Sequence, residues 1–196
     1  MKRILVVAAA TLLMMVVTAV AADDETIRVH LVGYQETPLT INTAATGEFK
    51  IRIHSDGSAI DYEETYRDLS SGVLQSHIHF GRPAITGGIV LFLCTNLTPP
   101  AGVPTPQPCP TTNPATITGT LTAADVIPSS GANAGQAIDP GAAGFAEMIK
   151  AIRAGAAYVN VHTTNHPSGE IRARLGPVDF NHRRDHDGGH DDGHDH

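Results

Sequence analysis

Alternation of apolar and polar residues dominates the chain and predicts β-strands. In residues 47–54, for example, Phe49, Ile51 and Ile53 fall on one face of an extended segment, with polar residues between them. A turn sequence, Ser-Asp-Gly-Ser, follows at 55–58, so this segment and the next are expected to form a hairpin. The predicted strands cover residues 27–32, 47–54, 59–69, 77–80, 88–94, 115–121 and 157–162.

One segment has the periodicity of a helix instead. Residues 144–154 place four apolar side chains on one helical stripe, and Gly155 supplies a stop. The stripe consists of Phe145, Met148, Ile149 and Ile152. Many short strands with Gly/Pro turns and one short helix favour an all-β fold, an antiparallel Greek-key β-sandwich or barrel.

Histidines stand out on two of the predicted strands. His77 and His79 are two residues apart, so they share one strand face, while Ile78 and Phe80 share the other. In residues 157–162, His162 lies on the polar face with Tyr158 and Asn160. If the two strands are close, three imidazoles converge, and imidazole nitrogen suits copper and zinc. The alternative, that these are ordinary histidines of a solvated strand face, stays open.

The two ends of the chain differ from the strand-rich part. Residues 1–21 have a basic start, an apolar run and a small-residue ending, which is typical of a secretory signal peptide. Residues 22–180 are long enough for one domain. Residues 181–196 are rich in His, Asp and Gly and are predicted to form a disordered tail that can bind metal. We therefore expect a periplasmic or secreted protein without a membrane anchor after cleavage.

Cysteine content and charge narrow the picture further. Cys94 and Cys109 bracket a Pro-rich stretch, and in an oxidising compartment they are expected to pair, although a role as metal ligands is the rival interpretation. A net charge of −7 argues against nucleic acid as a partner. His30 and His54 lie beside arginines on polar strand faces and are interpreted as surface residues.

Three segments in order resemble the CHRD (chordin) domain family. They are LVGYQETP at 31–38, SHIHFG at 76–81, and GAAYVNVH at 155–162 continuing to PSGEIR at 167–172. The resemblance covers about residues 27–175 and implies a β-sandwich module of exported proteins. Family membership by itself does not settle an activity.

A more distant resemblance, to Cu,Zn superoxide dismutase, bears on the chemistry. That enzyme also uses an HxH strand, a later strand ending in His, and a Gly followed by a nearby Arg. The resemblance implies copper ligands at His77, His79 and His162, and it makes Arg172 the candidate catalytic residue that attracts superoxide. No counterpart of the zinc loop is found, which implies a copper-only site, and His166 is a further candidate ligand.

Three hypotheses follow. The first is a copper protein with superoxide dismutase-like activity, in which Glu36 either orients a ligand imidazole or satisfies a turn. The second is an exported buffer or chaperone for copper or zinc, in which the tail takes part. The third is a non-catalytic interaction module. A homodimer is possible under all three, because long edge strands invite pairing.

Overall fold

The computed structural model describes residues 22–99, 104–128 and 135–176. The predicted signal peptide and the His/Asp tail lie outside the described residues. Eight strands follow one another in the order β1 Glu25–Val32, β2 Thr46–Ile53, β3 Ala59–Arg67, β4 Val73–Phe80, β5 Gly88–Thr95, β6 Ala115–Thr122, β7 Ala157–Thr163 and β8 Ile171–Leu175. One α-helix, α1 (Ala142–Arg153), precedes β7, and two short 3₁₀ helices, η1 (Gly33–Gln35) and η2 (Ala123–Asp125), follow β1 and β6.

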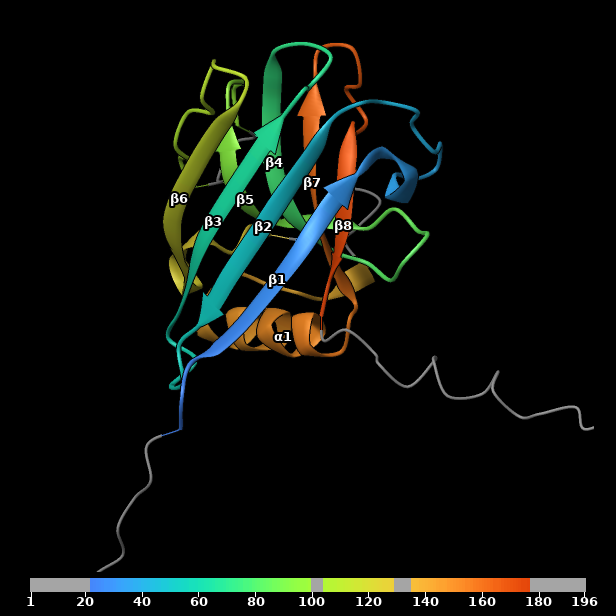
Figure 1. The fold of residues 1–196 in the computed structure, drawn as a ribbon. Coiled ribbons are helices and arrows are strands. Elements are labelled where there is room, and N and C mark those ends of the chain that lie inside the picture. Colours follow the sequence, from blue (N-terminus) through green and yellow to red (C-terminus); the bar gives the residue numbers. More distant parts are fainter. Residues whose placement is uncertain (1–21, 100–103, 129–134, 177–196) are drawn as a thin grey trace, which may run out of the picture.

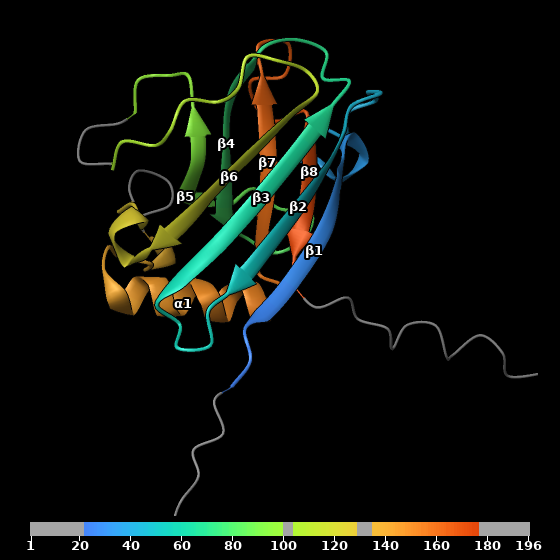
Figure 2. The ribbon, with the colours of Figure 1, turned by 60° about the vertical axis from the view of Figure 1, so that its left-hand side comes forward.

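All strands belong to one antiparallel sheet that folds back on itself. The strand order is β5-β4-β7-β8-β1-β2-β3-β6. Strands β1, β2, β3 and β6 form one layer, and β4, β5, β7 and β8 form the layer behind it, as Figure 1 shows. Helix α1 lies across one end of the two layers (Figure 2). The predicted fold, an all-β antiparallel sandwich or barrel with one short helix, is confirmed.

The strand pattern predicted from the sequence is largely confirmed. β2 pairs with β3 in the expected hairpin, with Ile53 opposite Ile60. The helix begins at Ala142, two residues earlier than the predicted start at residue 144. The prediction missed β8, because its five residues are too few to show a clear alternation.

The space between the layers is filled by the apolar faces that the alternation indicates. Phe49, Ile51 and Ile53 are fully buried there, and the stripe of α1 closes the same core from the end of the sandwich. One acidic residue, Glu64, lies among these side chains and is fully buried as well. A carboxyl group in an apolar core departs from the usual distribution of charged residues.

A disulfide joins Cys94, in β5, to Cys109. This confirms the predicted pairing and excludes both thiols as metal ligands. Such a bond is consistent with an oxidising compartment outside the cytoplasm. Among the described residues, no helix combines the length and apolar character needed to cross a bilayer.

Candidate metal centre

Three histidines meet on the face of the rear layer that points away from the core. His77 and His79 come from β4, and His162 comes from the neighbouring strand β7. Their apolar strand neighbours Ile78 and Val161 belong to the core cluster on the other face, as the alternation predicts. The nitrogen ligand atoms of the three side chains all lie within 4.8 Å of one another.

This face is covered, so the histidines do not lie on a solvated strand face, as the alternative interpretation of the sequence had it. His77 is 1% exposed, and His79 and His162 are each 6% exposed. The covering is made by loops whose contribution the strand pattern could not show: the carbonyl of Gly87 reaches His79, and that of Pro167 reaches His162. The histidines therefore lie beneath chain segments and not in solvent.

The imidazole rings pack directly against one another. The ring centroid of His77 lies 4.5 Å from the centroid of His79 and 4.5 Å from that of His162, while the centroids of His79 and His162 are 6.5 Å apart. Phe92 of β5 contacts the ring of His77 edge-on at 5.3 Å. His77 is thus the central member of the triad, with an apolar wall on one side.

Backbone carbonyls determine which nitrogen each outer histidine offers. Nδ1 of His79 lies 2.8 Å from the carbonyl oxygen of Gly87, and Nδ1 of His162 lies 2.9 Å from that of Pro167. A carbonyl only accepts, so each Nδ1 carries the proton and donates it. Nε2 of both rings then presents a lone pair, an arrangement typical of metal-binding histidines.

Burial keeps the three imidazoles neutral. The pKa of His79 is lowered to about 3 and that of His162 is also lowered, in both cases chiefly by burial. The pKa of His77 is lowered as well, by burial and by the two neighbouring histidines. Neither ring nitrogen of His77 has a hydrogen-bond partner, and the same is true of Nε2 of His162. Buried nitrogens without partners are costly, and a metal ion would satisfy them.

A stack of planar groups extends from the triad. The ring of Tyr158 lies parallel to that of His79, with centroids 4.4 Å apart and an angle of 8° between the planes. The guanidinium carbon of Arg172 lies 3.4 Å from the centroid of the same tyrosine ring. Two planar groups cannot occupy one ring face at these distances, so Tyr158 separates Arg172 from His79.

Arg172, the candidate catalytic residue, is held by the covering loops. Its guanidinium donates to the hydroxyl of Thr37 and, at 2.9 Å, to the carbonyl of Ile85. It also lines a cavity of about 470 Å³ together with Glu36 and Arg174. The side chain therefore fastens two loops over the site and borders a solvent-connected space.

Glu36 lies beside the triad as a buried carboxyl group. It is 4% exposed, and neither of its oxygens has a hydrogen-bond partner. Burial raises its pKa to about 7, and the nearby charge of Arg172 offsets only part of that effect. Gly169, at φ +124°, packs so closely that a Cβ there would overlap the carboxylate. Of the two roles that the sequence left open for Glu36, orienting an outer imidazole is not the arrangement found, since carbonyls hold both outer rings.

Another carboxylate fixes the turn that carries Pro167. Glu170 accepts hydrogen bonds from Thr43, Ser70 and Thr163, at distances between 2.6 and 2.9 Å. Burial acts to raise its pKa, but these donors lower it below the ordinary value. The carbonyl that orients His162 is thus anchored by a satisfied, charged group a few residues away.

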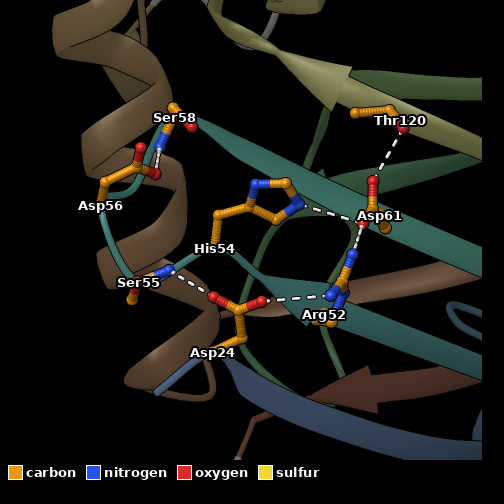
Figure 3. A network of polar contacts seen from close by, with 8 residues as sticks. All are labelled: Asp24, Arg52, His54, Ser55, Asp56, Ser58, Asp61 and Thr120. Atoms are coloured by element: carbon orange, nitrogen blue, oxygen red, sulfur yellow. Dashed lines mark hydrogen bonds and ion pairs between the residues drawn. The ribbon is translucent and has the colours of Figure 1, made fainter. Parts of the chain in front are cut away.

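The remaining histidines of the described chain lie elsewhere. His166 is half-buried in the turn after β7, where its backbone pairs with Thr163, and it is not among the clustered ligand atoms. His30 is exposed, as interpreted from the sequence. His54 is partly exposed and joins a network of charged residues with Asp61 and Arg52, shown in Figure 3.

Sequence reasoning assigned none of three neighbours of the triad to the site. Asn160 and Tyr158 share the strand face of His162, so the alternation that found His162 also contained the signal for both. Glu64 could not be found in this way. It contacts Ser76, next to His77, from the opposite layer, at 2.8 Å between Oγ and Oε1.

One of three comparisons with known proteins gives a match. The sequence profile of the CHRD domain matches residues 27–175. Neither the curated proteins nor the solved structures compared with the chain gave a match. The distant likeness to Cu,Zn superoxide dismutase is therefore not borne out.

Proposed function

The chain belongs to the CHRD domain family, and from this premise and the triad we propose that it is an exported copper-binding protein. The ligands are His77, His79 and His162. The observation that carries the proposal is the set of buried imidazole nitrogens without partners, held neutral and turned toward one another. Nothing in an ordinary packed core requires this arrangement, because unpaired polar atoms there lower stability.

The donor set favours copper over other divalent ions. Three imidazoles without a thiolate or a clustered carboxylate suit copper and zinc better than magnesium or calcium. Affinity for a given nitrogen site peaks at Cu²⁺ among the first-row divalent ions, so copper is the first choice and zinc the second. Three protein ligands also leave a coordination position free of the triad.

Metal content tests the proposal. The full-length mature chain and a His77→Ala/His79→Ala variant are loaded with Cu²⁺, desalted, and compared by mass spectrometry of total copper. The His-rich tail is common to both chains, so its contribution cancels in the difference. We expect about one copper fewer per chain in the variant, whereas His30→Ala, at an exposed position, serves as the matched control and keeps the full amount. Equal copper in all three chains would contradict the proposal.

Superoxide dismutation is a more specific proposal for the same site than copper binding. The geometry supports binding more strongly than turnover, because Tyr158 separates Arg172 from His79 and loops cover the triad. Pulse radiolysis of the copper-loaded chain decides between the two. Fast decay of superoxide that is lost in His77→Ala/His79→Ala would establish an enzyme. Stoichiometric copper without such decay would establish a protein that stores or delivers the ion.

A further inference from the structure

We infer that Asn160 supplies the fourth ligand atom of the metal centre through its side-chain oxygen, Oδ1, and that Glu36 holds the amide nitrogen of Asn160 when the ion is bound. The inference rests on the proposed function and extends it, because it assigns the coordination position that the three histidines leave open. Neither residue belongs to the histidine motif.

The strand register places Asn160 inside the triad. On β7 it lies two residues from His162 on the same face, and it is directly opposite His77 of β4. It is 3% exposed, so bulk solvent does not reach its amide. Its Oδ1 lies 3.1 Å from Nε2 of His79, the nitrogen that Gly87 leaves unprotonated. All three histidines are therefore direct or diagonal neighbours of this one side chain.

The contact between Asn160 and His79 brings two acceptors together. Because Nδ1 of His79 donates to the carbonyl oxygen of Gly87, Nε2 presents a lone pair, and Oδ1 presents another. Two lone pairs at 3.1 Å repel unless a cation lies between them. Ligand atoms on one metal at about 2.0 Å are separated by about 2.8 Å in square-planar and about 3.3 Å in tetrahedral geometry. The observed separation falls between these values.

Glu36 is the acceptor that we assign to the NH₂ group of the Asn160 side chain. The side chain of Asn160 lies close enough to the Glu36 carboxyl group to act on it, although no hydrogen bond of normal geometry reaches either oxygen. With Oδ1 committed to a metal, the NH₂ group of Asn160 needs an acceptor, and Glu36 offers two unpaired ones. A carboxylate also strengthens an amide oxygen as a ligand by drawing on its N–H groups.

The same amide can serve the metal-free protein. A half-turn about its terminal bond exchanges the oxygen and the NH₂ group, which then donates to the lone pair on Nε2 of His79. Asn160 therefore stabilises either state of the site without movement of the backbone. Leucine, of similar size, can do neither.

Copper affinity of full-length variants tests this assignment. The dissociation constant is measured by competition with a chelator of known affinity, and the Cu²⁺ EPR spectrum is recorded in parallel. We expect Asn160→Leu to weaken binding by about 10- to 100-fold and to change the hyperfine splitting. Glu36→Gln should weaken it by less and should add little in the Asn160→Leu background, because the two residues act as a unit. Asn165→Leu, in an exposed turn, is the matched control.

Exchanging the two side chains gives a second, more specific experiment that does not introduce an apolar residue. Combining Asn160→Asp with Glu36→Gln exchanges amide and carboxylate, which keeps an oxygen toward the metal and a hydrogen bond between the positions. Affinity near the wild-type value in this double variant supports the assignment. Unchanged or tighter binding and an unchanged spectrum in Asn160→Leu would overturn it. If the copper affinity of His77→Ala/His79→Ala also equals that of the wild type, both the proposed function and this inference fail. If only the Asn160 variants leave the affinity unchanged, this inference alone fails.

Discussion

Two clusters of polar side chains, one on each layer, show what separates a candidate site from ordinary surface chemistry. On the front layer, Asp61 accepts hydrogen bonds from His54, Arg52 and Thr120, and Arg52 also pairs with Asp24, as Figure 3 shows. Every charge there has a partner and contact with solvent. On the rear layer, neither ring nitrogen of His77 makes a hydrogen bond of normal geometry, and the side chain is buried. A histidine beside polar groups is common, whereas unpaired buried histidines that converge are not.

The two clusters also differ in the direction of their pKa shifts. Hydrogen bonds from His54, Arg52 and Thr120 lower the pKa of Asp61, so the folded state favours its charged form. Behind the triad, burial raises the pKa of Glu64 to about 8, and Ser76 offsets only part of this. The same residue class therefore prefers opposite charge states in the two regions. This contrast gives three tests, taken from the largest expected effect to the smallest.

Replacement of Glu64 should change how stability depends on pH. Its folded pKa lies above the unfolded value of 4.5, so the folded state binds the proton more tightly, and the stability from this group is lost as pH rises from about 4.5 to about 8. At about 1.4 kcal/mol per pH unit, the loss amounts to roughly 5 kcal/mol. Urea unfolding at pH 5, 7 and 8.5 should show this loss in the wild type and not in Glu64→Gln.

Glu63→Gln is the matched control for that comparison, because Glu63 is the adjacent residue of β3 and is exposed. It should follow the wild-type pH dependence. A Glu64→Gln variant with the same slope as both would mean that Glu64 is charged in the core, contrary to the burial argument.

Copper should stabilise the protein through the buried cluster alone. At a free concentration 100-fold above the dissociation constant, a bound ion adds about 2.7 kcal/mol, which for a domain of this size raises the melting temperature by roughly 5–10 °C. Differential scanning calorimetry of the full-length chain should show this rise in the wild type and in His54→Ala. It should be absent in His77→Ala/His79→Ala. A rise in melting temperature that is lost in His54→Ala would place the ion in the exposed network and contradict the prediction.

Disruption of the exposed network should have the smallest effect. Asp61→Asn removes the acceptor shared by His54 and Arg52, but solvent screens such pairs, so we expect the melting temperature to fall by about 2 °C or less. The loss should shrink in high salt. In the wild type, the contribution of Asp61 is present above its unfolded pKa of 3.8 and is lost as the pH falls below it, the opposite sense to Glu64. A large loss that salt does not reduce would contradict this description.

The motif spacing predicted much of the candidate site because strand geometry is strictly periodic. A spacing of two positions is sufficient to place His77 and His79 on one strand face, and the same rule places His162 on the face that Val161 and the core do not occupy. The apolar faces, the disulfide and the helix stripe followed from equally local rules. His166 shows the limit of such rules: its position four residues after His162 carries no geometric meaning, since a turn and not a strand connects them.

What the sequence by itself determined, then, is the fold class and which side chains share a strand face, because both depend on contacts between residues close in the chain. Only the tertiary structure decided that β4 lies beside β7, that loops bury the histidines, and that Asn160 contacts His79 on one side and Glu36 on the other. Glu36 and Asn160 are separated by more than a hundred residues of chain, and the carbonyls of Gly87 and Pro167 that set the imidazole tautomers are backbone atoms that no residue type reveals. Burial and hydrogen-bond satisfaction are properties of the packed chain as a whole, and for this reason the chemistry of the triad emerges only after folding.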